Sequence, residues 1–193
     1  MILWYVCFSM LLCCLNIFAL KKIEFKKINL YIITSGILNL IFVLTNAFFK
    51  ELHISSFFDV FSINMLMYLS LWDIKESEMP SIAFAIYAFI GVIASLFNGF
   101  IITIIFTLVV FGVLFLIQKK FKSGMGMGDV YAISCISFFS TTSETMSIVM
   151  LSLLLSLVYG VVYSLLKKMS SKTVMIRFIP FLFIMSYLIK IFY

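Results

Sequence analysis

The chain has 193 residues, of which 64% are hydrophobic and only 11% charged, with a net charge of +6 and a mean hydropathy of +1.22. Soluble domains average about 45–50% apolar and about 25% charged residues, so this composition excludes a single-core soluble fold and a disordered chain. The remaining class is a polytopic membrane protein. The basic residues are spread over short loops rather than clustered, so we expect no nucleic-acid partner.

Eight continuously apolar segments follow one another along the chain. They cover about residues 2–20, 28–49, 57–72, 81–97, 100–118, 130–141, 145–166 and 174–192. A transmembrane β-barrel needs alternating strands of about ten residues, so these uninterrupted runs predict helices. The third and sixth runs are short for a full span, which is typical of a thinned region or a polar cavity. We therefore expect an all-α transmembrane bundle with about eight spans, in which residues 1–193 form one integral membrane domain.

The basic residues fall almost entirely on one side of the predicted bundle. Twelve of the fourteen lie in the first, third, fifth and seventh loops, and the others are Lys50 and Lys190. Since positively charged loops stay in the cytoplasm, we expect both termini to lie outside. The first apolar run lacks a basic start and a small-residue cleavage site, so we interpret it as a retained helix rather than a signal peptide. The twelve residues are Lys21, Lys22, Lys26, Lys27, Lys75, Lys119, Lys120, Lys122, Lys167, Lys168, Lys172 and Arg177.

Two of the eight acidic residues differ from the rest. Asp73 ends the third apolar run and Asp129 begins the sixth, so each carboxylate lies at a membrane boundary. A carboxylate at mid-helix costs about 2.5–3.5 kcal/mol on insertion scales, and less near helix ends, so acids in this setting are functional candidates. Two spans separate them, and both therefore lie at the cytoplasmic level although they are 56 residues apart. The acids interpreted as ordinary solvated charges are Glu24, Glu51, Asp59 and Glu144.

Two carboxyl groups that share a water can divide the work of acid and base. Close like charges do not both ionise readily, so one group keeps a proton, as in aspartic proteases. A proton- or cation-coupled transporter also uses intramembrane acids. On the spacing alone, both interpretations remain open.

A glycine-rich segment leads into Asp129. Gly124, Gly126 and Gly128 alternate with methionines. Since glycine permits close backbone approach and positive φ, a substrate segment could lie against this loop, with Asp129 on an unwound turn. The alternative is a helix-packing contact through Gly124 and Gly128. A phosphate-binding loop is disfavoured because no Gly-Lys-Ser/Thr follows.

The segment 124–129, Gly-Met-Gly-Met-Gly-Asp, resembles the GxGD signature of the type IV prepilin peptidases, membrane aspartyl proteases that process pilin-like precursors. In that family an Asp at the end of a span is followed seven residues later by Pro, as Asp73 is followed by Pro80. A weaker match at residues 176–182 resembles the family's Pro-Phe-Leu start of the last span. The resemblance covers about residues 55–185.

The resemblance implies an aspartic endopeptidase whose catalytic residues are Asp73 and Asp129, with no cofactor and no metal. It implies a prepilin-like substrate with a short basic leader and an apolar helix in the bilayer, cleaved at the cytoplasmic face of a prokaryotic cell membrane. One aspartate then acts as general base and the other as general acid. The residues expected to bind substrate or shape the loops are Gly124, Gly126, Gly128, Glu76, Glu78 and Pro80.

The chain departs from the family pattern at two positions and in one loop. Tyr131 stands where the family usually has Lys, and Ser81 stands where it usually has Asn. The first loop extends only from Lys21 to Lys27, so the resemblance implies a peptidase-only member without the N-methyltransferase activity of larger enzymes. The alternatives are a presenilin-type protease, whose motifs the chain lacks, a small carboxylate-relay transporter, and a catalytically silent assembly partner.

Overall fold

The computed structural model describes residue 11 and residues 36–45, 54–75, 80–98, 101–121, 126–167 and 176–192. Every regular element within these residues is a helix, which confirms the all-α fold. The predictions for the first apolar run and for Gly124, Glu76 and Glu78 lie outside the described residues.

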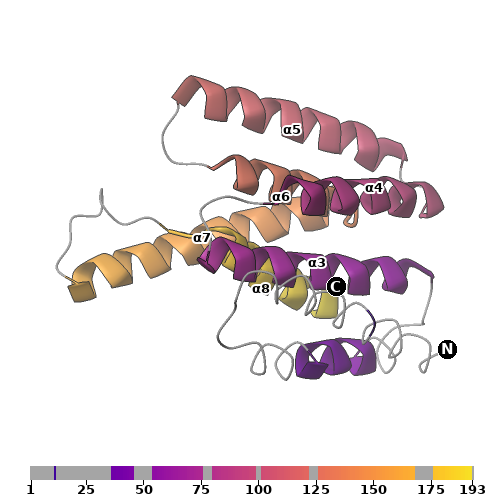
Figure 1. The fold of residues 1–193 in the computed structure, drawn as a ribbon, viewed down its shortest axis with the longest axis horizontal. Helices are drawn as coiled ribbons and strands as arrows, with labels where there is room; N and C mark the ends of the chain where they lie inside the picture. The colour runs from indigo at the N-terminus through magenta and orange to yellow at the C-terminus, as the bar shows by residue number, and fades with distance from the viewer. Residues whose placement is uncertain are drawn as a thin grey trace.

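The described helices run roughly side by side and alternate in direction (Figure 1). A short helix, Gly36–Thr45, precedes α3 (Ile54–Lys75), α4 (Ser81–Phe97), α5 (Ile101–Phe121), α6 (Met127–Ser137), α7 (Thr142–Lys167) and α8 (Ile179–Phe192). Within the described ranges, three helices are long and apolar enough to cross a membrane, namely Ser55–Ile74, Ile101–Lys120 and Thr142–Lys167. The described part of the chain thus supports three spans by length and composition, fewer than the eight predicted.

Two helix boundaries differ from the predicted ones at positions that affect the candidate site. The third run was expected at 57–72, but α3 continues to Lys75, so Asp73 lies inside the last helical turn. The sixth run was expected at 130–141, but α6 covers Met127–Ser137, so Asp129 lies in its first turn. At 1.5 Å per residue, the 11 residues of α6 extend for about 16 Å, well short of a hydrocarbon core of about 30 Å.

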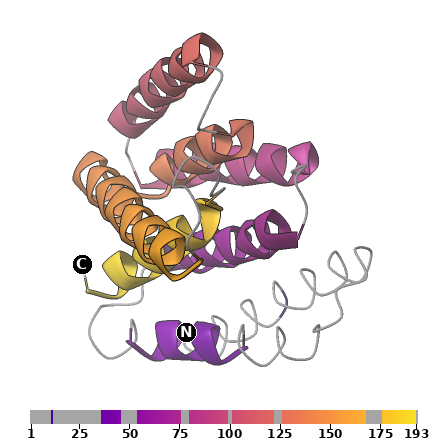
Figure 2. The same cartoon turned by 90° about the vertical axis from the view of Figure 1, so that its left-hand side faces the viewer.

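The buried core lies between α3, α4, α6 and α8. Leu66, Leu69, Tyr87, Ile136 and Leu182 are fully buried there. By contrast, α5 and α7 have only 11% and 17% of their apolar spans buried, and the end view in Figure 2 places α5 at one edge of the bundle. Large apolar side chains on these two helices are therefore available to lipid.

Polar contacts at the far end of the bundle from Asp73 hold the C-terminal end of α6. The Ser95 hydroxyl donates to the Phe138 carbonyl at 2.7 Å, and the Lys190 ammonium donates to the Phe139 carbonyl at 2.8 Å. Lys190 is buried and also pairs with Asp59 of α3. The interpretation of Asp59 as an ordinary solvated charge is therefore wrong, because a buried lysine needs an anionic partner.

Glu144 is also not an ordinary solvated charge, because it caps a helix. It lies in the first turn of α7, where its carboxylate accepts the Thr141 N–H at 2.8 Å. The Glu144 N–H donates in return to the Thr141 hydroxyl at 3.3 Å. This reciprocal pair is a capping box, which satisfies two N–H groups at the start of the helix.

A glycine sets the distance between α4 and the end of α6. A Cβ added at Gly91 would lie 2.7 Å from Phe138 Cβ, and that atom is too close to the backbone to move aside. We expect Gly91→Ala to lower the free energy of unfolding by about 1–3 kcal/mol, as overpacking generally does. Gly112→Ala is the matched control, because a Cβ there meets nothing within 4 Å. Denaturant titration in mixed micelles measures both, and equal stability of the two variants would contradict the close approach.

Candidate active site

Asp73 lies on the buried face of α3, near the end of the helix. It follows Leu69 by one helical turn, which directs its side chain toward the core, and it is 8% exposed. Its carboxylate accepts the backbone N–H of Ile179, at the start of α8. Its Oδ1 atom lies 3.5 Å from Nη1 of Arg177, while its Oδ2 atom is buried without a hydrogen-bond partner among the described residues.

Asp129 is held by the first turn of α6. The helix begins after Gly126, whose N–H donates to Asp129 Oδ2 at 3.2 Å. The Gly126 carbonyl accepts the N–H groups of Asp129 and Val130 at 3.1 and 3.3 Å. A carboxylate at this position satisfies an N–H group that the helix leaves open and interacts favourably with the helix dipole.

The two carboxylates are electrostatically coupled. Burial and then the negative charge of Asp73 raise the pKa of Asp129 from its ordinary value to about 6, against the opposing effects of the Gly126 N–H and the Arg177 charge. The field of Asp73 thus acts on a residue 56 positions away in the sequence. When two carboxylates interact in this way, the protonation of each depends on the other.

Arg177 was counted in the sequence only as a basic loop residue, and the structure brings it to Asp73. It lies in the segment that precedes α8, and its side chain is 36% exposed. One signal was present in the sequence, because Arg177 falls inside the eighth predicted apolar run. An arginine within an apolar run indicates a buried partner.

The other predicted site residues that the structure describes take ordinary helical positions. Gly126 is the N-cap of α6 with φ −70° and ψ 152°, and Gly128 lies within the helix, so the expected unwound turn is absent from this described segment. Pro80 is the N-cap of α4 with φ −71° and accepts the Ala83 N–H at 3.0 Å. Both caps fix the start of a helix at the end of the bundle that carries the two aspartates.

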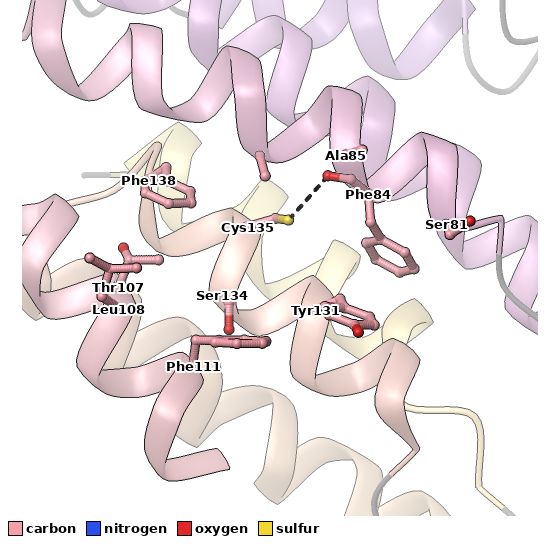
Figure 3. A pocket seen from close by; sticks show the side chains of 11 residues that line it. Ser81, Phe84, Ala85, Thr107, Leu108, Phe111, Tyr131, Ser134, Cys135 and Phe138 are labelled. Atoms are coloured by element: carbon pink, nitrogen blue, oxygen red, sulfur yellow. Dashed lines mark hydrogen bonds between the residues drawn. The ribbon is translucent and has the colours of Figure 1, made fainter. Parts of the chain in front are cut away.

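A cavity of about 380 Å³ lies between α4, α5 and α6 and does not include either aspartate. Its lining includes Ser81 and Tyr131, the two departures from the family pattern (Figure 3). The Tyr131 ring stacks on the Phe111 ring, with 5.9 Å between the ring centroids. The Cys135 thiol contacts the Phe84 carbonyl at 3.8 Å beside it. Because Tyr131 follows Asp129 by two residues, the two side chains leave α6 on nearly opposite sides. The cavity is thus separated from the aspartate pair by the helix itself.

In the described ranges, no three His, Cys, Asp or Glu side chains form a cluster that could hold a metal ion. A model described as the type IV leader peptidase family matches residues 60–165. The chain belongs to this family. Its membership identifies a leader-peptidase type of protease and confirms the family that the two motifs indicate.

The matched region of the leader peptidase contains both Asp73 and Asp129, whereas Arg177 lies beyond it. A search of curated proteins and a search of solved structures each found no match.

The hydrogen bond from the Gly126 N–H stabilises ionised Asp129, so removing it should change the pKa of that carboxyl in this peptidase. Gly126→Pro removes that donor, and the φ of −70° already suits proline. We expect the pKa of Asp129 to rise above about 6, measured by infrared titration of the carboxyl band. Gly126→Ala keeps the N–H, and its Cβ would lie at an ordinary 3.5 Å from Asp129 Oδ2, so its titration should match the wild type. Identical titrations of the proline and alanine variants would show that the bond has no effect.

Proposed function

We propose that the protein is an aspartic endopeptidase that removes the leader from prepilin-like precursors, with Asp73 and Asp129 as its catalytic pair. The observation that carries the proposal is that Asp129 lies in a partly buried site close enough to Asp73 to feel its charge, so that burial and then the Asp73 charge raise the pKa of Asp129 to about 6. A pair that holds one proton up to about pH 6 meets the requirement of aspartic proteolysis. Membership of the type IV leader peptidase family supports the same reaction.

The proposed reaction divides one water molecule between the two products. The ionised aspartate takes a proton from the water as its oxygen attacks the scissile carbonyl carbon. The protonated aspartate donates a hydrogen bond to the carbonyl oxygen and so stabilises the developing negative charge. As the C–N bond breaks, a proton passes to the leaving amine, and the pair returns to its singly protonated form.

The proposed substrate carries a basic leader on an apolar helix, and cleavage occurs at the cytoplasmic membrane face. Two features support this placement. The lysine-rich loops of the sequence indicate which end faces the cytoplasm, and α5 and α7 expose apolar surface that suits a bilayer. Glu76 and Glu78, which follow Asp73 in the sequence, are proposed to attract the leader.

Removing either acid should abolish cleavage of a synthetic precursor. Asp73→Asn and Asp129→Asn each leave the pair without one of its two functions, and we expect kcat/KM to fall by at least about 10³-fold, given that loss of acid–base catalysis costs about 10²–10⁴-fold. Glu144→Gln is the control, because Glu144 caps α7 and takes no part in the site. Normal cleavage by either asparagine variant would refute the proposal.

The pH dependence of cleavage should reflect the titration of Asp129. As the pH rises through about 6, the free enzyme loses the single proton of the pair. We expect kcat/KM, which reports the free enzyme, to fall about tenfold per pH unit above that point. Initial rates between pH 4 and 8 measure this limb, with Glu144→Gln expected to keep it in place. A kcat/KM that still increases between pH 7 and 8 would contradict the prediction.

A further inference from the structure

We propose that Arg177 is the positioning residue that keeps Asp73 as the ionised member of the pair, so that Asp73 is the general base and Asp129 carries the proton. This assignment rests on the proposed peptidase function and adds to it the roles of the two acids. The roles follow from the different surroundings of the two carboxylates.

Two contacts of Asp73 favour its ionised form and oppose the effect of burial, which favours the neutral form. Nη1 of Arg177 lies 3.5 Å from its Oδ1, and the carboxylate accepts the Ile179 N–H at the N-terminus of α8. A guanidinium stays charged at every pH at which proteins are studied, and the first turn of a helix adds a further positive potential. Both contacts stabilise the negatively charged form of Asp73.

The free oxygen of Asp73 is suited to a base. Its Oδ2 is buried and has no hydrogen-bond partner among the described residues. An ionised carboxylate oxygen only accepts hydrogen bonds, so this atom is available to accept one from the attacking water and then to take its proton. The corresponding Oδ2 of Asp129 already accepts the Gly126 N–H at 3.2 Å.

Asp129 has weaker compensation for a negative charge. The Gly126 N–H, the first turn of its own helix and the Arg177 charge favour its ionised form, but burial and the charge of Asp73, the two largest effects, oppose it. With one proton on Asp129, the two carboxyl groups and the Arg177 guanidinium have no net charge. That balance suits a partly buried site better than two anions and one cation do.

Close packing on both sides of Arg177 fixes the position of its backbone. On the N-terminal side, Ile176 packs so closely on α7 that a Cβ added at Gly160 would overlap its Cδ1 atom. On the C-terminal side, Phe178 and Ile179 are buried in the core. The guanidinium therefore reaches Asp73 from a fixed segment, although its own side chain remains 36% exposed.

The charged groups that act on the pair come from several helices. Asp73 comes from α3, Asp129 from α6 and Arg177 from the segment before α8. Tyr68 lies five residues before Asp73 on α3, and α4 begins after Pro80 at the end of the bundle where α3 ends (Figure 1). Further cationic side chains described toward this end of the bundle are Lys119 and Lys120 of α5 and Lys167 of α7.

Infrared titration of the full-length protein in detergent tests where the proton resides without any need for activity. The protonated-carboxyl band that titrates near pH 6 should disappear in Asp129→Asn. It should persist in Asp73→Asn and titrate at lower pH, because the neighbouring negative charge is gone. A band that persists in Asp129→Asn and disappears in Asp73→Asn would overturn the assignment.

Kinetics with a synthetic precursor test Arg177 itself. In Arg177→Gln, we expect the acid limb of kcat/KM to move upward by at least about one pH unit, since a neighbouring arginine shifts a carboxyl titration by about 1–3 units. Arg177→Lys keeps the charge and should move the limb by less than half as much. Lys119→Gln, which removes an exposed cation from the last turn of α5, should leave the limb in place.

The outcomes separate this inference from the proposed function. A uniform loss of rate in Arg177→Gln, with both limbs unmoved, would indicate a structural role and overturn the inference. The same holds if Arg177→Gln and Lys119→Gln give the same profile. If Arg177→Gln does not fold, the comparison of Arg177→Lys with the wild type and the two infrared titrations still test which aspartate is ionised. Normal cleavage by Asp73→Asn or Asp129→Asn would instead refute the peptidase function.

Discussion

The shortness of α6 is the constraint on which the rest of the structure depends. With 11 residues, the helix ends inside the bundle, where a backbone polar group without a partner costs several kcal/mol. Directly after its last residue, the carbonyls of Phe138 and Phe139 accept hydrogen bonds from Ser95 and Lys190. At its N-terminal end, Asp129 accepts the Gly126 N–H. The carboxylate proposed for catalysis therefore also caps the helix that presents it.

At Asp73, too, a carboxylate lies at the start of a helix. The end of α3 meets the start of α8, so a buried carboxylate lies against an open helix N-terminus and the guanidinium that precedes it. Each group compensates another that would be costly alone. Both acids thus lie at a helix N-terminus, Asp129 in the first turn of α6 and Asp73 against the first turn of α8. The direct ion pair with Arg177 distinguishes Asp73 from Asp129.

The sequence predicts those features that depend on local composition. The apolar runs place α4 at residues 81–97, as observed, and two intervening helices of alternating direction return Asp129 to the end of the bundle that holds Asp73. The contacts of Arg177, and the pair formed by Lys190 and Asp59, were not predictable because they join segments that meet only after packing. Exact helix ends were also missed, since caps rather than hydropathy decide them.

Two ionic contacts join α3 to the α8 region at opposite ends of both helices. Asp73 meets Arg177 at one end, and Asp59 meets Lys190 at the other. Their spacings are nearly equal, 14 residues along α3 and 13 along α8 and the segment before it. Inserting or deleting one residue in either stretch would advance the axis by about 1.5 Å and rotate one contact by about 100°. The number of residues between the two ionic contacts therefore fixes the axial register of the helices. An insertion or deletion between them would break at least one of the two contacts.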